Sequence, residues 1–290
     1  MTKHSIKNNL RLGTFVLFAL IATTVAAQHT KQLIIVHTND THSRIEPTDK
    51  NAARADQADK GGYARRSVFI DSVRQSNTPM ILLDCGDFSQ GTPYYTIFRG
   101  DVEIDLMNKL GYDAGTIGNH EFDYGMDNML RLFRRANFPI VCSNYDFTGT
   151  MLEGVVKPYT VINRGGIRIG IIGLGPVLKG LVFKKHYQGI KFCDPAETTN
   201  RYAKLLREKM KCDLVVVISH LGYKMDEGYP SDFLLVPQIR GVDMVLGGHT
   251  HTFLATPTWL NDADGKKVPI SQMGKNGQFV GTMTVNFTKK

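Results

Sequence analysis

Gly118-Asn119-His120-Glu121-Phe122-Asp123 places an amide, an imidazole and two carboxylates within six residues. The stretch follows a short apolar run ending at Ile117, which indicates the end of a buried strand, and it precedes a helical pattern that continues to Ala136. Loops that join a strand to a helix commonly carry the chemistry of α/β proteins. A single polar loop is weak evidence, so the rest of the chain has to supply its partners.

Four further loops have the same form, each following a strongly apolar run. The runs are 31–38, 80–83, 214–218 and 242–246. The polar residues that follow them are, in chain order, Asp40 and His42, then Asp87, then His220, then His249 and His251. Near-continuous apolar runs are typical of strands covered on both faces, and open α/β sheets bind ligands beyond the carboxyl ends of their strands. We therefore expect the five loops to converge on one edge.

The remaining pattern predicts alternating helices and strands without an internal repeat or domain boundary. Helices are expected over 62–76, 94–98, 102–110 and 195–211, strands over 139–143, 268–273 and 282–287, a hairpin within 159–173 that turns at Gly165-Gly166, and a long loop over 45–60. With 42% hydrophobic residues among 290, the chain can build a sizeable core as one unit.

Residues 1–27 have the features of a secretory signal peptide. Lys3, Lys7 and Arg11 precede an apolar run from Thr14 to Val25, which is too short for a membrane span of roughly 20 residues. Small residues precede Gln28, so we expect cleavage there, a mature catalytic domain over 28–290, a secreted or periplasmic location and no stable membrane insertion. The alternative is an uncleaved N-terminal anchor.

Charge and cysteine content limit the partners. Removing the three basic residues of the leader lowers the formal charge from +8 to +5, which suits small anionic substrates. No Lys/Arg block interleaves with aromatic residues, so we expect no nucleic acid partner.

The four cysteines show no C-x-x-C spacing, which disfavours a cysteine zinc site. The sequence leaves two states of the cysteines open, buried thiols and at least one disulfide.

The side chains of the five loops form a hard-to-borderline metal-binding set without thiolate. Each loop alone has an ordinary explanation: His220 can be a hydrogen-bonding residue, Asp87 a helix cap, and Gly-His-Thr-His a polar turn. Their equivalent positions after apolar strands favour a shared site instead. Seven or eight ligands are too many for one ion and suit two ions roughly 3.5–4 Å apart, with a carboxylate such as Asp87 bridging them.

These motifs, in this order, resemble the calcineurin-like metallophosphoesterases. Thr38-Asn39-Asp40-Thr41-His42 and Gly118-Asn119-His120-Glu121-Phe122-Asp123 are similar to the 5′-nucleotidase/UDP-sugar hydrolase branch, and the resemblance covers about 33–287. It implies an α/β sandwich of two mixed β-sheets flanked by helices. It also implies two divalent metal ions, among Zn, Mn, Co, Fe and Ca.

The resemblance assigns roles to matching positions. Asp40, His42 and His251 would hold the first ion, Asp87 would bridge, and Asn119, His220 and His249 would complete the second. His251 stands where that branch often has Gln, which leaves the metal preference open. His120 and Asp123 would form a catalytic dyad, in which the imidazole stabilises the transferring phosphoryl group or protonates the leaving oxygen.

The implied activity is an exported phosphoric ester hydrolase of the EC 3.1.3 type, hydrolysing nucleotides by a metal-activated water. The alternatives are a 2′,3′-cyclic nucleotide phosphodiesterase, a UDP-sugar hydrolase, and a non-catalytic binding subunit, which the dyad argues against. The chain ends at Lys290, where the catalytic domain of that branch should end, so we expect its C-terminal substrate-binding domain to be absent. A separate chain would then supply it, or specificity would be broad, or the substrate would not be a nucleotide.

Other candidates have structural interpretations. We expect Glu121 to brace its loop, His37 to be structural within the first strand, and His186 to lie in a solvated basic loop. Apolar residues within 151–159 and 223–233 either shape a small substrate pocket or pack into the core.

Overall fold

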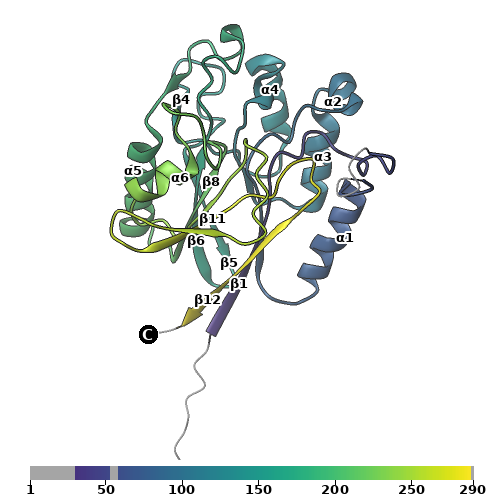
Figure 1. Cartoon of the computed structure of the whole chain (residues 1–290). Helices are drawn as coiled ribbons and strands as arrows, with labels where there is room; N and C mark the ends of the chain where they lie inside the picture. Colours follow the sequence, from purple (N-terminus) through teal and green to yellow (C-terminus); the bar gives the residue numbers. More distant parts are fainter. Residues whose placement is uncertain (1–29, 53–57, 289–290) are drawn as a thin grey trace, which may run out of the picture.

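The computed structural model describes residues 30–52 and 58–288, so the predicted signal peptide lies outside the described residues. Two β-sheets lie face to face with helices on their outer faces (Figure 1). This arrangement confirms the predicted α/β sandwich of two mixed sheets flanked by helices.

The first sheet has the strand order β12-β1-β2-β3. Strands β1 (Thr30–Thr38), β2 (Met80–Asp84) and β3 (Ala114–Gly115) are parallel, whereas β12 (Gly281–Thr288) runs antiparallel to β1. The register pairs Thr30 with Thr288 and His37 with Gly281. The start of β1 and the end of β12 therefore lie together, at the end of the sheet opposite the carboxyl ends of β1 and β2 (Figure 1).

The second sheet has the order β10-β11-β9-β8-β6-β5. Its central strands β6 (Ile167–Leu174), β8 (Leu214–Ser219), β9 (Met244–Leu246) and β11 (Lys267–Ser271) are parallel. The edge strands β5 (Tyr159–Arg164) and β10 (Thr258–Asn261) add antiparallel hairpins, the first turning at the predicted Gly165-Gly166. The short strands β4 (Tyr145–Asp146) and β7 (Lys191–Phe192) pair separately.

Helices cover the outer faces of both sheets. The first sheet is covered by α1 (Tyr63–Arg74), α3 (Asp101–Leu110) and α4 (Gly125–Arg135), and the second by α5 (Pro195–Glu208) and α6 (Asp232–Leu235). The other helical segments are α2 (Pro93–Phe98) and the 3₁₀ turns η2 (His120–Phe122), η3 (Lys184–His186) and η4 (Val236–Gln238). The predicted helices are thus confirmed to within a few residues at their ends.

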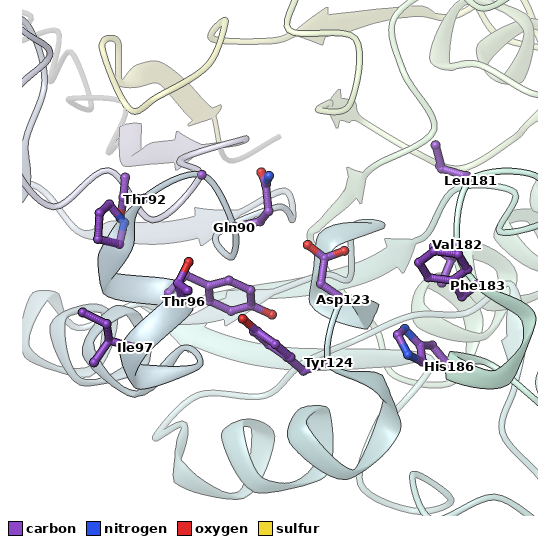
Figure 2. Close-up of a pocket in the computed structure, with 13 residues that line it drawn as sticks. Gln90, Thr92, Thr96, Ile97, Asp123, Tyr124, Leu181, Val182, Phe183 and His186 are labelled. Carbon is purple, nitrogen blue, oxygen red and sulfur yellow. The ribbon is translucent and has the colours of Figure 1, made fainter.

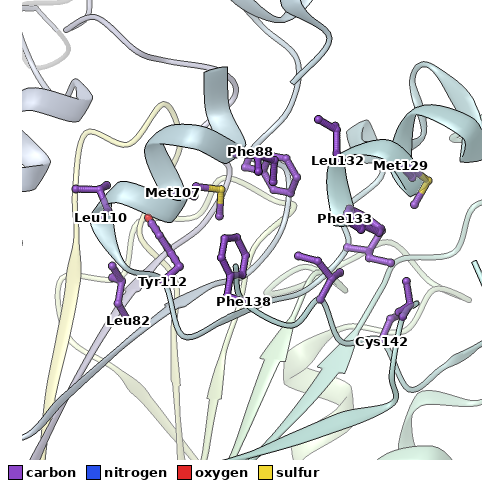
Figure 3. Packing of buried hydrophobic residues seen from close by; sticks show 14 of the residues in the cluster. Leu82, Phe88, Met107, Leu110, Tyr112, Met129, Leu132, Phe133, Phe138 and Cys142 are labelled. Atoms are coloured by element: carbon purple, nitrogen blue, oxygen red, sulfur yellow. The ribbon is translucent and has the colours of Figure 1, made fainter. Parts of the chain in front are cut away.

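The alternation of side chains explains why the strands read as continuous apolar runs. In β8, Val216 and Ile218 pack between the two sheets, whereas Val215 and Val217 pack under α5. In β2, Leu83 faces the other sheet, and Leu82 joins Met107 and Phe133 beneath the helices (Figure 3). Each fully buried aliphatic side chain of this kind contributes about 1.5–3 kcal/mol.

One predicted strand is wrong. Residues 139–143 form only isolated bridges, Ile140 with Gly115 and Val141 with Lys157. The backbone N–H of Ser143 then donates to the carbonyl of Gly173 in β6. The segment crosses from the first sheet to the second, so no ladder can form along it.

Cysteine pairing and membrane-spanning helices can be assessed for the described part of the chain. All four cysteines are thiols, with Cys193 the least buried. No helix among residues 30–52 and 58–288 is long and apolar enough to cross a membrane.

Candidate metal centre

The predicted loops meet where the ends of both sheets face each other. Strands β1, β2 and β3 deliver Asp40, Asp87 and the segment from Gly118, while β8 and β9 deliver the histidines of the second sheet. His220 Nε2 lies 3.1 Å from Asp87 Oδ2 and 3.7 Å from Asp40 Oδ1. The edge expected from the sequence is therefore shared by two sheets.

Among residues 30–52 and 58–288, three groups of potential ligands have their ligand atoms within 4.8 Å of one another. They are Asp40–His42–His251, His42–Asp87–His120 and Asp87–His220–His249. The first contains the residues expected for the first ion, and the third joins the expected bridge to two ligands of the second. His120 lies within the same reach, so the distances alone allow it to bind an ion as well as to act in the dyad.

The donor atoms fit divalent cations. His42 Nε2 lies 2.9 Å from His251 Nε2, which brings two imidazole nitrogens together beside the Asp40 carboxylate. The side-chain oxygen of Asn119 is buried and has no hydrogen-bond partner among the described residues. Carboxylate, amide and imidazole donors without sulfur suit borderline and hard divalent ions.

The pKa shifts of these residues also indicate a site that favours cations. Burial alone would lower the pKa of His220, but the carboxylates of Asp87 and Asp40 outweigh it and raise the pKa to about 10. Burial, reinforced by His220, lowers the pKa of His249 to about 4. Burial raises the pKa of Asp87, but His220 and two further histidines outweigh it and hold it well below its usual range. The two buried carboxylates, Asp40 and Asp87, therefore favour positive charge at this site.

The backbone is strained at five of the seven predicted ligands. Positive φ angles between 46° and 76° occur at Asp40, His42, Asp87, His249 and His251. Non-glycine residues rarely adopt this left-handed conformation, and it costs about 1–3 kcal/mol each. Such strain gathered in one place is typical of functional sites.

Glycines allow the loops to approach closely. A Cβ atom on Gly118 would lie 2.1 Å from Asp87 Oδ1, and one on Gly248 would lie 2.7 Å from His220 Nδ1. Any larger residue at either position would displace a predicted ligand.

Three buried side chains hold the loops. The Glu121 carboxylate accepts the backbone N–H groups of Gly118, Asp87 and Ser89, as expected of a brace. Asn39 donates to Asp40 and to the carbonyl of Gly274. Gln272 donates to the carbonyl of Gly248 and accepts from the Thr252 N–H.

For two of these three residues, the sequence contains no sign of a positioning role. Asn39 belongs to the motif before His42, but its contact with the loops near the C-terminus has no local sequence signal. Gln272 acts on a loop more than twenty residues away, which β11 places beside it by pairing with β9.

The predicted dyad forms at the rim of the site. His120 Nδ1 lies 3.0 Å from Asp123 Oδ2, and the two side chains are 30% and 36% exposed. Burial lowers the pKa of His120, but the hydrogen bond to Asp123 and the Asp87 charge outweigh it, so the pKa is raised. With Nδ1 engaged, Nε2 is the ring nitrogen left without a partner in the dyad.

The two other histidines differ in outcome. His37 is fully buried at the seam between the sheets, with Nε2 3.1 Å from Ser271 Oγ, in agreement with a structural role. The prediction for His186 holds in part: it lies on η3 beside the exposed Lys184 and Lys185, but its own side chain is half-buried and lines a cavity beside Asp123.

Comparisons with known proteins agree with this geometry. The profile of the calcineurin-like phosphoesterase family matches residues 33–253. The snake venom 5′-nucleotidase of Gloydius brevicauda is 34% identical over 277 residues, which cover 89% of this chain and 46% of the venom protein.

Solved structures of nucleotidases are also similar to this chain. A 5′-nucleotidase precursor from Thermus thermophilus superposes with a TM-score of 0.78 and 33% identity, over 88% of this chain and 51% of that one. The NAD nucleotidase of Haemophilus influenzae gives 0.77 and 25%, over 89% and 54%. The chain therefore spans about half the length of the relatives it matches.

Proposed function

The chain belongs to the calcineurin-like phosphoesterase family, and from that premise we propose that it is a metal-dependent phosphoesterase acting on nucleoside 5′-monophosphates. The observation that carries the proposal is the set of adjoining Asp/His groups around Asp87, next to the His120–Asp123 pair. Similarity to 5′-nucleotidases favours the substrate class.

The residues divide into ion-holding and proton-handling groups. Asp40, His42 and His251 would hold one ion, Asn119, His220 and His249 the other, and Asp87 would contact both. When bound, such a pair of ions supplies positive charge for the phosphoryl oxygens and makes water a better nucleophile.

The dyad handles the leaving group. Asp123 accepts the Nδ1 proton of His120 and so fixes the ring orientation and the tautomer. The Nε2 proton of a cationic His120 then stabilises the phosphoryl oxygens or passes to the leaving oxygen. The raised pKa of His120 keeps more of it in the protonated form that both roles need.

Export is part of the same proposal. It rests on the basic start and apolar run within residues 3–25 and the small residues before Gln28. Mass spectrometry of the N-terminus of the purified protein tests it: a start at Gln28 is expected, and an intact Met1 in the exported fraction would contradict cleavage.

A substrate panel tests the activity. Nucleoside 5′-monophosphates, 2′,3′-cyclic nucleotides and UDP-glucose should be assayed with Mn²⁺, Zn²⁺, Co²⁺ and Ca²⁺ after removal of bound metal. We expect release of phosphate from the monophosphates that disappears with chelator and returns with one or more of the ions. Because the relatives are about twice as long, each assay should be repeated with any separate chain resembling their remaining half. Turnover of cyclic nucleotides or UDP-glucose alone would overturn the proposed substrate.

A further inference from the structure

A cavity of about 800 Å³ opens beside the dyad, and Asp123 is part of its lining. Figure 2 shows Thr96 and Ile97 of α2 on one side of it, Val182 and Phe183 on the other, and Asp123 with Tyr124 between them. The cavity is within the usual range of small-molecule sites, about 300–1,000 Å³.

Apolar side chains are exposed on both walls of this cavity. Phe183 is 75% exposed, Ile97 is 68% exposed and Leu181 is 46% exposed. Large apolar groups that gather around a cavity with a few polar groups are typical of ligand sites. The polar groups here include Asp123, Gln90 and Thr96.

Aromatic rings in the lining are already held in place. The Arg99 guanidinium lies 4.2 Å from the centre of the Tyr124 ring, and the Tyr95 ring lies 5.2 Å from it. Phe183 makes an edge contact with His186 at 5.8 Å. Ordered rings offer a flat bound group a stacking surface at little cost in conformational entropy.

The cavity adjoins the dyad through Asp123. Asp123 belongs both to its lining and to the pair with His120, the group proposed to serve the leaving oxygen. A second cavity, of about 240 Å³, is lined by the predicted ligand His249 together with Met225 and Tyr229. That volume is below the usual range for a small-molecule site.

We propose that the cavity between α2 and η3 binds the base of a nucleoside 5′-monophosphate, with Phe183 and Tyr124 as the residues that recognise its ring. This inference rests on the proposed function, since it names the part of the substrate that this chain recognises by itself. It assigns the substrate pocket to residues other than 151–159 and 223–233, for which the sequence left a small pocket and core packing both open.

The test compares two substrates whose phosphate is carried by the 5-hydroxyl of ribose. AMP has adenine at C1 of the ribose, where ribose 5-phosphate has a hydroxyl, so their ratio of kcat/KM reports base recognition. We expect wild type to favour AMP, and Phe183→Ala to lower the ratio about tenfold, mainly through KM for AMP, because loss of one stacking ring commonly has an effect of this size. Phe183→Trp should restore the preference, and Tyr124→Leu should lower it.

Tyr229→Ala is the matched control, because Tyr229 is also exposed but lines the smaller cavity. An unchanged ratio in Phe183→Ala and Tyr124→Leu, or an equal fall in Tyr229→Ala, would overturn the inference. Calorimetric titration with adenosine provides a readout independent of turnover: wild type should bind and Phe183→Ala should bind more weakly. If adenosine binds in this way while no phosphate ester is hydrolysed, the proposed function fails and the base site stands.

Discussion

Two histidines, His37 and His220, are both fully buried, yet their surroundings drive them in opposite directions. His37 lies at the seam between the sheets beside the Ser271 hydroxyl, and burial lowers its pKa to about 4. His220 lies at the candidate metal centre, where Asp87 and Asp40 overcome the effect of burial and raise its pKa to about 10.

This comparison shows what distinguishes the candidate metal centre from the hydrophobic core. Burial alone makes an imidazole neutral, as at the seam. Beside two buried carboxylates, the same burial strengthens the attraction of a positive charge, whether a proton or a divalent ion. The carboxylates, rather than the histidines, therefore favour positive charge at this end of the sandwich.

Replacing Asp87 tests this conclusion most severely. Asp87→Asn keeps the shape but removes the charge that is shared between two of the ligand groups. We expect bound metal to fall from about two ions per chain to less than one, and turnover to fall further than it does on loss of His120, because the ions would supply both the charge for the phosphoryl oxygens and the activated water. Elemental analysis and phosphate release measure the two effects. Retention of both ions would show that Asp87 does not bridge.

His120→Ala should have the next largest effect. Loss of general acid–base catalysis lowers turnover by about a hundredfold or more. Metal content should barely change, because the other residues of the Asp87 groups remain. The same elemental analysis decides between the two positions that the distances allow: a large loss of metal would make His120 a ligand.

Asp123→Asn keeps the imidazole and should therefore cost less than His120→Ala. Burial lowers the pKa of His120, and the Asp123 hydrogen bond and charge raise it. Removing that charge lowers the pKa, so a cationic His120 is lost at lower pH and the alkaline limb of kcat moves to lower pH. The pH profile of kcat measures the shift. A limb that stays in place would mean that another group sets it.

His37→Asn should leave turnover unchanged and alter only stability. The unfolded chain protonates this residue below about pH 6.5, whereas the folded protein keeps it neutral down to about pH 4. Its contribution, at most about 3 kcal/mol, is present above pH 6.5 and is lost as the pH falls through 4. Urea unfolding from pH 7.5 to 4 should show a shallower decline in the free energy of unfolding for the variant. If the free energy of unfolding of the variant declines equally steeply, then groups other than His37 cause the pH dependence.

Most of the fold could be predicted because its strands are buried on both faces. Runs such as 214–218 are apolar throughout, which indicates strands covered on both faces, and the family resemblance added that they form two packed sheets. Residues 139–143 are also largely apolar, but they cross between the sheets, and apolarity cannot distinguish a ladder from a crossing. Strand β10 was missed because its four residues alternate in exposure around Trp259 and carry too short a pattern.

The positions of the candidate ligands could be predicted because each follows a buried strand by a few residues. The structure brings Asp40, Asp87, His220 and His251 together, and their roles stay predictions. The cavity could not be predicted, because its walls come from 90–97 and 181–186, which only the folded chain brings face to face. The positive φ angles at the ligands likewise have no sequence signal, since no glycine marks them.

The antiparallel pairing of β12 with β1 has a practical consequence. Thr288 lies opposite Thr30, seven residues along the strand from the Gly281–His37 pair, so about 24 Å of strand separates it from the end of the sheet near the dyad. An affinity tag, dye or solid support joined beyond Thr288 would emerge at the far pole of the molecule. Immobilised preparations made in this way should leave the mouth of the cavity facing free solution.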